Sequence, residues 1–202
     1  LWTFRHSGVG YSGPAVVSDR IYIMGGRNSR AELLSIDAAS GRLIWSKPVN
    51  NKIFDFEGNS WGAGPRATPT VAGEMIYALA GNGELAAFNV EGELRWQVNM
   101  VRDLGGSISI VDAGEPETYG WGYCWSPLVD GKKVICVPGG DRGMIAALDR
   151  ETGEVIWRSE NLTDDATYSS PIKATVDGVD LYIVMTQGGI AGIAAVDGEL
   201  LW

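Results

Sequence analysis

The sequence predicts an all-β protein, a β-propeller of four consecutive blades in which each blade is a four-stranded antiparallel sheet. One pattern occurs four times along the 202 residues, and every copy ends on a tryptophan. Each copy holds short runs of β-branched and aromatic residues separated by turn residues. Four-stranded units that repeat every ~40–50 residues are typical of propeller blades. A β-sandwich also has evenly spaced strands, but it does not explain a proline and a tryptophan that return at fixed places.

Each copy begins near a proline that follows glycine or a small polar residue. From this proline to the closing tryptophan the spacings are 31, 27, 30 and 31 residues. The pairs are Pro14 with Trp45, Pro69 with Trp96, Pro127 with Trp157, and Pro171 with Trp202. We therefore divide residues 1–202, taken as one propeller segment, into repeats of approximately 3–48, 49–98, 99–160 and 161–202. Because Trp2 closes an earlier copy, we expect an internal piece of a longer protein.

Within a repeat we expect four strands, named A to D in chain order. In the third repeat they cover 125–129, 133–138, 144–149 and 154–158. Pairs such as Asn82-Gly83, Asp130-Gly131 and Asp177-Gly178 supply the positive φ angles that tight hairpins require. No window shows a sustained period of 3.6 residues, so helices are not expected.

The segment from strand C to strand D indicates which family of propellers the sequence resembles. Residues 35–45 read SIDAASGRLIW and residues 147–157 read ALDRETGEVIW. Both resemble the A-x-D-x-x-T-G-x-x-x-W tryptophan-docking repeat of pyrroloquinoline quinone (PQQ)-like propellers. The second copy has Asn89 in place of aspartate and Gly92 one residue early, and the fourth is shorter still. The resemblance covers the whole chain, and it implies a propeller of about eight blades, of which four would form an open half-ring.

The motif also has a physical rationale of its own. A tryptophan buries ~150–250 Å², which suits stacking against a neighbouring blade. Aspartate, serine and threonine can satisfy backbone groups at the turn, and glycine can adopt the left-handed conformation. We expect the first three tryptophans to be mostly buried and the terminal ones to be more exposed. The residues assigned to docking are Trp45, Trp96, Trp157, Trp202, Asp37, Gly41, Asp149 and Gly153.

Antiparallel alternation predicts where a binding surface lies. The short A–B and C–D turns share one face, and the B–C turns and D–A connections share the other. Two D–A connections are long, at residues 50–64 and 99–122, and long loops on a rigid scaffold commonly carry function. The aromatic residues of these connections and of the starts of strand A have two possible roles. They either form a binding surface for a protein or small-molecule ligand, or they plug the central channel of the propeller and pack the loops. The proposed binding residues are Trp61, Arg66, Trp121, Tyr123 and Tyr168.

The residues predict neither a catalytic site nor a metal site. The one histidine, His6, is next to Ser7, and adjacent residues on a strand face opposite sides. The acidic residues lie in scattered loops without the spacing of a calcium loop. Cys124 and Cys136 are either small buried residues or, if Asp130-Gly131 forms a hairpin turn, a possible disulfide pair.

Charge and hydropathy exclude two classes of partner. The formal net charge is −9 without a basic stripe, which argues against nucleic acid because phosphate binding needs clustered Lys and Arg. No uncharged apolar stretch reaches the ~20 residues of a transmembrane helix.

The resemblance implies two alternative functions. The chain is similar to the propeller of the outer-membrane β-barrel assembly lipoprotein, which implies a non-catalytic binding or assembly scaffold in the periplasm or cell envelope, without a cofactor. It is also similar to quinoprotein dehydrogenases, which implies a fragment of a PQQ- and Ca²⁺-dependent alcohol or sugar dehydrogenase. In those enzymes PQQ lies on the propeller axis with Ca²⁺, a catalytic Asp and often an adjacent cysteine pair. This sequence has no Cys-Cys pair, which favours the scaffold, and we expect no tight binding of PQQ or Ca²⁺.

Overall fold

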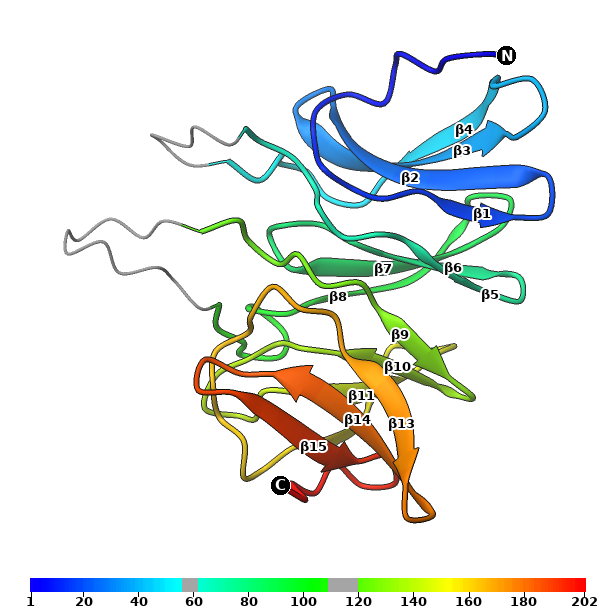
Figure 1. Cartoon of the computed structure of the whole chain (residues 1–202). Coiled ribbons are helices and arrows are strands. Elements are labelled where there is room, and N and C mark those ends of the chain that lie inside the picture. The colour runs from blue at the N-terminus through cyan, green and yellow to red at the C-terminus, as the bar shows by residue number, and fades with distance from the viewer. Residues whose placement is uncertain (56–61, 109–119) are drawn as a thin grey trace.

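The computed structural model describes residues 1–55, 62–108 and 120–202, and these form four antiparallel sheets in chain order (Figure 1). Blade one contains β1 (Ala15–Val17), β2 (Arg20–Arg27), β3 (Arg30–Asp37) and β4 (Leu43–Pro48). Blade two contains β5 (Thr70–Ala72), β6 (Met75–Leu79), β7 (Glu84–Asn89) and β8 (Leu94–Asn99). Blade three contains β9 (Leu128–Asp130), β10 (Lys133–Cys136), β11 (Ala146–Asp149) and β12 (Val155–Arg158). Blade four contains β13 (Ile172–Val176), β14 (Val179–Met185) and β15 (Ile190–Ala194).

Consecutive strands are hydrogen-bonded neighbours in every sheet, so each blade is an up-and-down meander. The predicted all-β propeller architecture is confirmed, with one difference in blade four. There, the expected fourth strand forms only the bridge between Ile193 and Leu200 and backbone hydrogen bonds between Gly192 and residues 201–202.

The two faces of the molecule differ as antiparallel alternation requires. Short A–B and C–D turns lie on one face, at the right of Figure 1, and the stems of the long loops lie on the opposite face. The A–B turns are as tight as two residues, with Ser18 at a φ of 54° and Asp177 at 50°. In the described residues no helix is long and apolar enough to cross a membrane.

Strand A of each blade begins after the proline rather than before it. In blade three, β9 starts at Leu128, three residues later than predicted, because Pro127 has no N–H to donate to a ladder. The residue before the proline bonds to the next blade instead. The Thr68 N–H donates to Ser126 Oγ over 3.0 Å, and the Ser126 N–H donates to Ser170 Oγ over 2.8 Å. These hydroxyls join the starts of blades two, three and four.

A β-bulge interrupts the outer strand pair of blades one, two and three at the same place. The register shifts between Ser35 and Ile36, between Ala87 and Phe88, and between Ala147 and Leu148. The extra residue on the outer strand is the one directly before the closing tryptophan. Bulges at sheet edges re-aim a side chain and end regular pairing. The bulge therefore turns each tryptophan toward the neighbouring blade and makes the outer edge irregular.

Burial separates the central blades from the last one. Strand β7 of blade two is buried along almost its whole length, because it is covered on both faces by other blades. Strand β13 of blade four is mostly exposed. The larger core cluster lies across blades two, three and four, and Trp125 is the largest fully buried side chain. Cys124 and Cys136 are both free thiols, so the disulfide that the sequence left open is not formed.

Candidate functional site

The predicted docking tryptophans lie against glycines of the next blade. A Cβ built on Gly153 would come 2.8 Å from the ring of Trp96, and one on Gly198 would come 2.5 Å from Trp157. These glycines have φ angles of 77° and 85°, which L side chains rarely adopt. Trp2 meets Gly41 in the same way. The close approach of a flat indole to a bare backbone explains why glycine occupies this turn position.

Exposure of the tryptophans follows their position in the chain. Trp96 and Trp157 are 8% and 9% exposed, whereas Trp2 and Trp202 are 41% and 52% exposed. Trp45 is only partly buried. The turn of blade two that meets Trp45 has one residue fewer before its glycine, and a Cβ on that glycine, Gly92, would lie 3.0 Å from the Trp45 ring.

The motif aspartates act within their own turns. Asp37 Oδ1 accepts hydrogen bonds from the Ser40 N–H and Oγ at 2.7 and 2.5 Å. Asp149 Oδ1 accepts from the N–H groups of Glu151 and Thr152 at 2.8 and 3.0 Å. These hydrogen bonds lower the pKa of both carboxyl groups. The aspartates therefore serve the turns that seat the tryptophans.

One equivalent position lies at the entrance to strand A in every blade, three residues before the proline. It is Tyr11 in blade one, Arg66 in blade two, Cys124 in blade three and Tyr168 in blade four. In blade three, Trp121 lies over this position from the preceding loop. We call Tyr11, Arg66, Trp121 and Tyr168 the mouth row, because they stand where the chain enters the innermost strands from the long-loop face.

Arg66 is the cation at the centre of the mouth row. Its guanidinium carbon lies 4.8 Å from the ring centroid of Tyr11 and 6.0 Å from that of Trp121. Its Nη1 donates to the Gly64 carbonyl over 3.2 Å, and its Nη2 donates to the Gly62 carbonyl over 3.0 Å. Aromatic faces attract a guanidinium at such distances. The side chain is thereby held in one orientation between two rings.

Trp121 is fixed by its backbone as well as by its ring. Its N–H donates to the hydroxyl of Tyr168 over 3.3 Å, and the two rings lie 5.1 Å apart at 41°. The thiol of Cys124 donates to the Trp121 carbonyl over 3.3 Å. Burial raises the pKa of Cys124 to about 12, against an opposing effect of Arg66, so the thiol stays protonated and remains a donor at neutral pH.

Two predicted binding residues occupy different places. Tyr123 is 1% exposed, its hydroxyl donates to the Pro138 carbonyl over 2.9 Å, and its ring meets Trp125 edge-on at 6.3 Å. Burial raises the pKa of this phenol well above its usual value. Tyr123 therefore lies beneath the surface and supports the loop from below. Trp61 lies outside the described residues.

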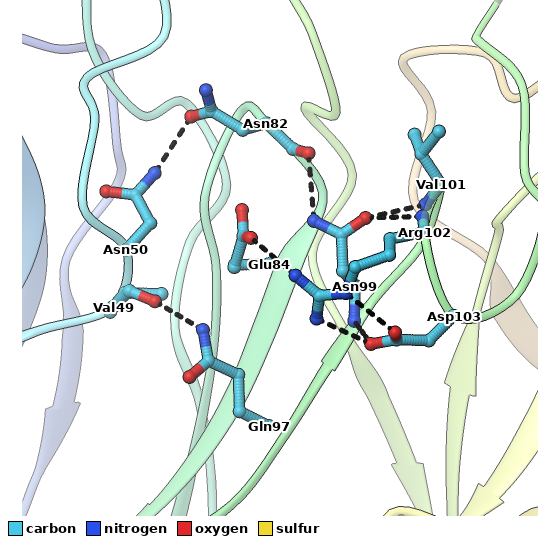
Figure 2. Close-up of polar contacts among 9 residues, drawn as sticks. All are labelled: Val49, Asn50, Asn82, Glu84, Gln97, Asn99, Val101, Arg102 and Asp103. Atoms are coloured by element: carbon cyan, nitrogen blue, oxygen red, sulfur yellow. Dashed lines mark hydrogen bonds and ion pairs between the residues drawn. The ribbon is translucent and has the colours of Figure 1, made fainter.

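A network of asparagines holds the stems of the long loops, and the sequence analysis missed it (Figure 2). Asn50 Nδ2 donates to Asn82 Oδ1 over 2.8 Å, and Asn99 Nδ2 donates to the Asn82 carbonyl over 3.4 Å. Asn99 Oδ1 accepts the Arg102 N–H over 2.8 Å, and Asp103 Oδ2 accepts the Asn99 N–H over 2.8 Å. The available signal was an asparagine at or just after the end of an outer strand, with Asn99 ending β8 and Asn50 two residues after β4.

Arg158 fastens the second long loop to blade three. Its Nε donates to the Gly143 carbonyl over 2.8 Å, its Nη2 donates to the Gly139 carbonyl over 3.0 Å, and its Nη1 bonds to the Leu104 carbonyl. Burial lowers the pKa of this guanidinium. The loop that carries Trp121 thus leaves from a rigid base.

The described residues offer no grouped set of metal ligands. Across 1–55, 62–108 and 120–202 no three His, Cys, Asp or Glu side chains are grouped so that they could hold a metal ion. Cys124 has Tyr123 and Trp125 as chain neighbours rather than a second cysteine. The mouth row offers rings, a guanidinium and hydroxyls, which is chemistry for binding.

The four blades and their tryptophan-on-glycine contacts define a PQQ-like β-propeller. A family model described as outer membrane protein assembly factor BamB matches residues 1–120 and 103–202, so the chain belongs to this family.

Comparisons with individual sequences and solved structures give the same family and fold. The BamB of Alkalilimnicola ehrlichii is 26% identical over 95% of this chain and 42% of its own length. The crystal structure of BamB from Moraxella catarrhalis superposes with a TM-score of 0.63 and 15% identity, over 94% of this chain and 50% of that one. Quinohemoprotein alcohol dehydrogenase from Comamonas testosteroni superposes with a TM-score of 0.61 and 18% identity, over 97% of this chain and 35% of that one. The chain thus spans less than half the length of the curated BamB relatives that it matches.

Proposed function

We propose that this chain is part of a non-catalytic scaffold of the bacterial cell envelope, and that it holds a protein partner on its long-loop face through the mouth row. The observation that carries the proposal is the fixed arrangement of Arg66 between Tyr11 and Trp121. Aromatic residues and arginine dominate binding energy at protein interfaces. Support for the location and for a protein partner comes from the relatives, whose name is outer membrane protein assembly factor.

The pre-organisation of the mouth row supports binding over simple packing. Tyr11 is 62% exposed and Trp121 is 38% exposed, although both are large aromatic side chains. Side chains already held in one conformation lose little entropy when a partner arrives. Tyr123 and the asparagine network contribute indirectly, because they fix the loop stems below the row.

The test uses site-specific photo-crosslinking in cells that produce the full-length protein. A photoreactive amino acid replaces Tyr11 or Tyr168 on the long-loop face, and Lys132 or Glu154 on the short-turn face as matched control sites. We expect crosslinks to one discrete envelope protein from the first pair and none from the second.

Crosslinks from the short-turn sites alone would contradict the proposal. Calorimetric titration of the purified protein with PQQ and Ca²⁺ checks the enzyme alternative. Sub-micromolar binding of both would favour the dehydrogenase.

A further inference from the structure

We infer that the partner presents to the mouth row an extended segment with a single carboxylate beside an aromatic side chain. This inference rests on the proposed function, because it names the chemistry that the same surface recognises. It is carried by the donors that Arg66 has left, the exposure of the two rings beside it, and the order of the row across the blades.

No carboxylate within residues 1–55, 62–108 and 120–202 forms an ion pair with Arg66. Its hydrogen bonds go to the carbonyls of Gly62 and Gly64, and the ion pairs of the described residues do not include it. A guanidinium has five N–H donors, and these two bonds leave three. A carboxylate is the acceptor whose geometry and charge match such a group best. Four arginines differ, since Arg27, Arg30, Arg95 and Arg102 each pair with a glutamate or aspartate, whereas Arg150 and Arg158 resemble Arg66 in bonding to backbone carbonyls.

The rings on both sides of Arg66 favour an aromatic neighbour for that carboxylate. Tyr11 and Trp121 flank the guanidinium and keep much of their area exposed. Aromatic pairs prefer offset or edge-to-face contacts with centroids 4.5–7 Å apart. Trp121 and Tyr168 form one such pair at 5.1 Å, which shows that aromatic rings pack against one another at this surface.

The shape of the row selects an extended ligand. Its members come from blades one, two, three and four in that order, so the row crosses the entrances of four neighbouring strands. A segment lying along it meets Tyr11, then Arg66, then Trp121. A net charge of −9 opposes a long acidic tract, because the rest of the surface repels it. One carboxylate placed at Arg66 avoids that repulsion.

The experiment measures binding of three blocked hexapeptides to the purified full-length protein by tryptophan fluorescence. The first contains Glu-Phe between Gly and Ser spacers, the second Gln-Phe, and the third Glu-Ala. We expect the Glu-Phe peptide to bind at least about fivefold more tightly than either of the others, because each control removes one of the two contacts. Equal affinity for the three peptides, or no binding of any, would overturn the inference.

Two variants of the protein test whether Arg66 is the group that recognises the carboxylate of the peptide. Arg66→Gln should weaken the Glu-Phe peptide about fivefold and leave the Gln-Phe peptide within about twofold, since only the former presents a charge to the guanidinium. The matched control is Arg95→Gln on β8, next to the short-turn residues Glu74 and Glu91, which should change neither affinity. An equal loss for both peptides in Arg66→Gln would mean that Arg66 acts only in packing.

Failure of this inference is distinguishable from failure of the proposed function. If the peptides show no preference while the Tyr11 and Tyr168 crosslinks persist, the surface binds a partner of other chemistry. If the crosslinks are absent as well, the proposed function falls with the inference.

Discussion

The junction between blades two and three and the junction between blades three and four bury the same kind of tryptophan by different means. At the first, the Trp96 Nε1 donates to the Arg150 carbonyl over 3.0 Å, and the Tyr77 hydroxyl donates to the same carbonyl over 3.0 Å. At the second, the Nε1 of Trp157 is buried without a hydrogen-bond partner. There the equivalent carbonyl, that of Ala195, is taken by the ammonium of Lys133.

The two junctions also differ in which blade supplies the tyrosine that packs on the tryptophan. Tyr77 belongs to the same blade as Trp96, and its ring lies 5.9 Å away. Tyr182 belongs to the blade after Trp157, and its ring lies 6.1 Å away. Its hydroxyl donates back to Asp130 Oδ2 over 2.7 Å, and Lys173 bonds to Asp130 Oδ1 over 3.0 Å.

Comparing the two junctions shows which groups both of them keep and which groups differ between them. Both junctions keep the indole, the facing glycine and one tyrosine, because these set the distance between two sheets. The polar groups around them vary, since a hydrogen bond or an ion pair can come from either blade. The turns of blades three and four both place their glycine four residues after the end of strand C, but Asp149 at the start of the first turn is replaced by Ala194 in the second.

Removing the indoles should give the largest effects and should differ between the junctions. We expect Trp96→Ala to lower the free energy of unfolding by about 4 kcal/mol and Trp157→Ala by about 3 kcal/mol. Only Trp96 loses a hydrogen bond, whereas Trp157→Ala also removes an unsatisfied buried N–H. Urea unfolding with matched m-values measures both. A larger loss for Trp157→Ala would contradict the comparison.

Adding a methyl group to the facing glycine should break either junction. We expect Gly153→Ala to cost about 2–4 kcal/mol, because its Cβ would lie 2.8 Å from the Trp96 ring and its φ is 77°. Gly131→Ala is the control, with a φ of 58° and no atom within 4 Å of its Cβ, so it tests strain alone. Thermal unfolding that gives the two variants the same loss would argue against close indole packing.

The polar network of the second junction should depend on pH. The hydroxyl of Tyr182 lowers the pKa of Asp130, with a further contribution from Lys173. A carboxyl whose folded pKa is depressed stabilises the fold above its unfolded pKa of about 3.9, and loses that effect as pH falls through the folded value.

Asp130→Asn should therefore cost about 1–2 kcal/mol at pH 7 and progressively less below about pH 4. Urea titrations of both proteins across this range measure the difference. A difference that did not change with pH would mean that the carboxylate charge contributes nothing to the junction.

The smallest effect should come from converting one junction toward the other. Lys133 and Met75 occupy the same register position, opposite Asp149 and Asn89 respectively. Lys133→Met frees the Ala195 carbonyl for the indole of Trp157, so one hydrogen bond replaces another. We expect stability to change by less than about 0.5 kcal/mol while hydrogen exchange at the Trp157 indole slows. An unchanged indole exchange rate would show that the carbonyl stays unavailable.

The fold was predictable because proline, tryptophan and the turn glycines mark every blade boundary. The bulges were not, since the residue before the tryptophan is Ile44, Arg95 or Ile156, and neither isoleucine nor arginine is a residue type that marks a bulge. The long-loop face was predictable as the place of the candidate site, through the length and the aromatic residues of its D–A connections. Which of them is buried was not, because Gly122, at a φ of 71°, turns the chain between Trp121 and Tyr123. Alternation alone would place both on one side.

Three members of the mouth row, Tyr11, Arg66 and Tyr168, stand at one equivalent position of their blades, and this has an evolutionary consequence. The hydroxyls of Ser126 and Ser170, two residues further along the chain, tie neighbouring blades together without using the residue at that position. Tyrosine, arginine and cysteine all occupy it here without altering the strand that follows. A gene that duplicates its blades can therefore diversify its recognition surface one residue at a time, while selection on folding acts elsewhere in the repeat.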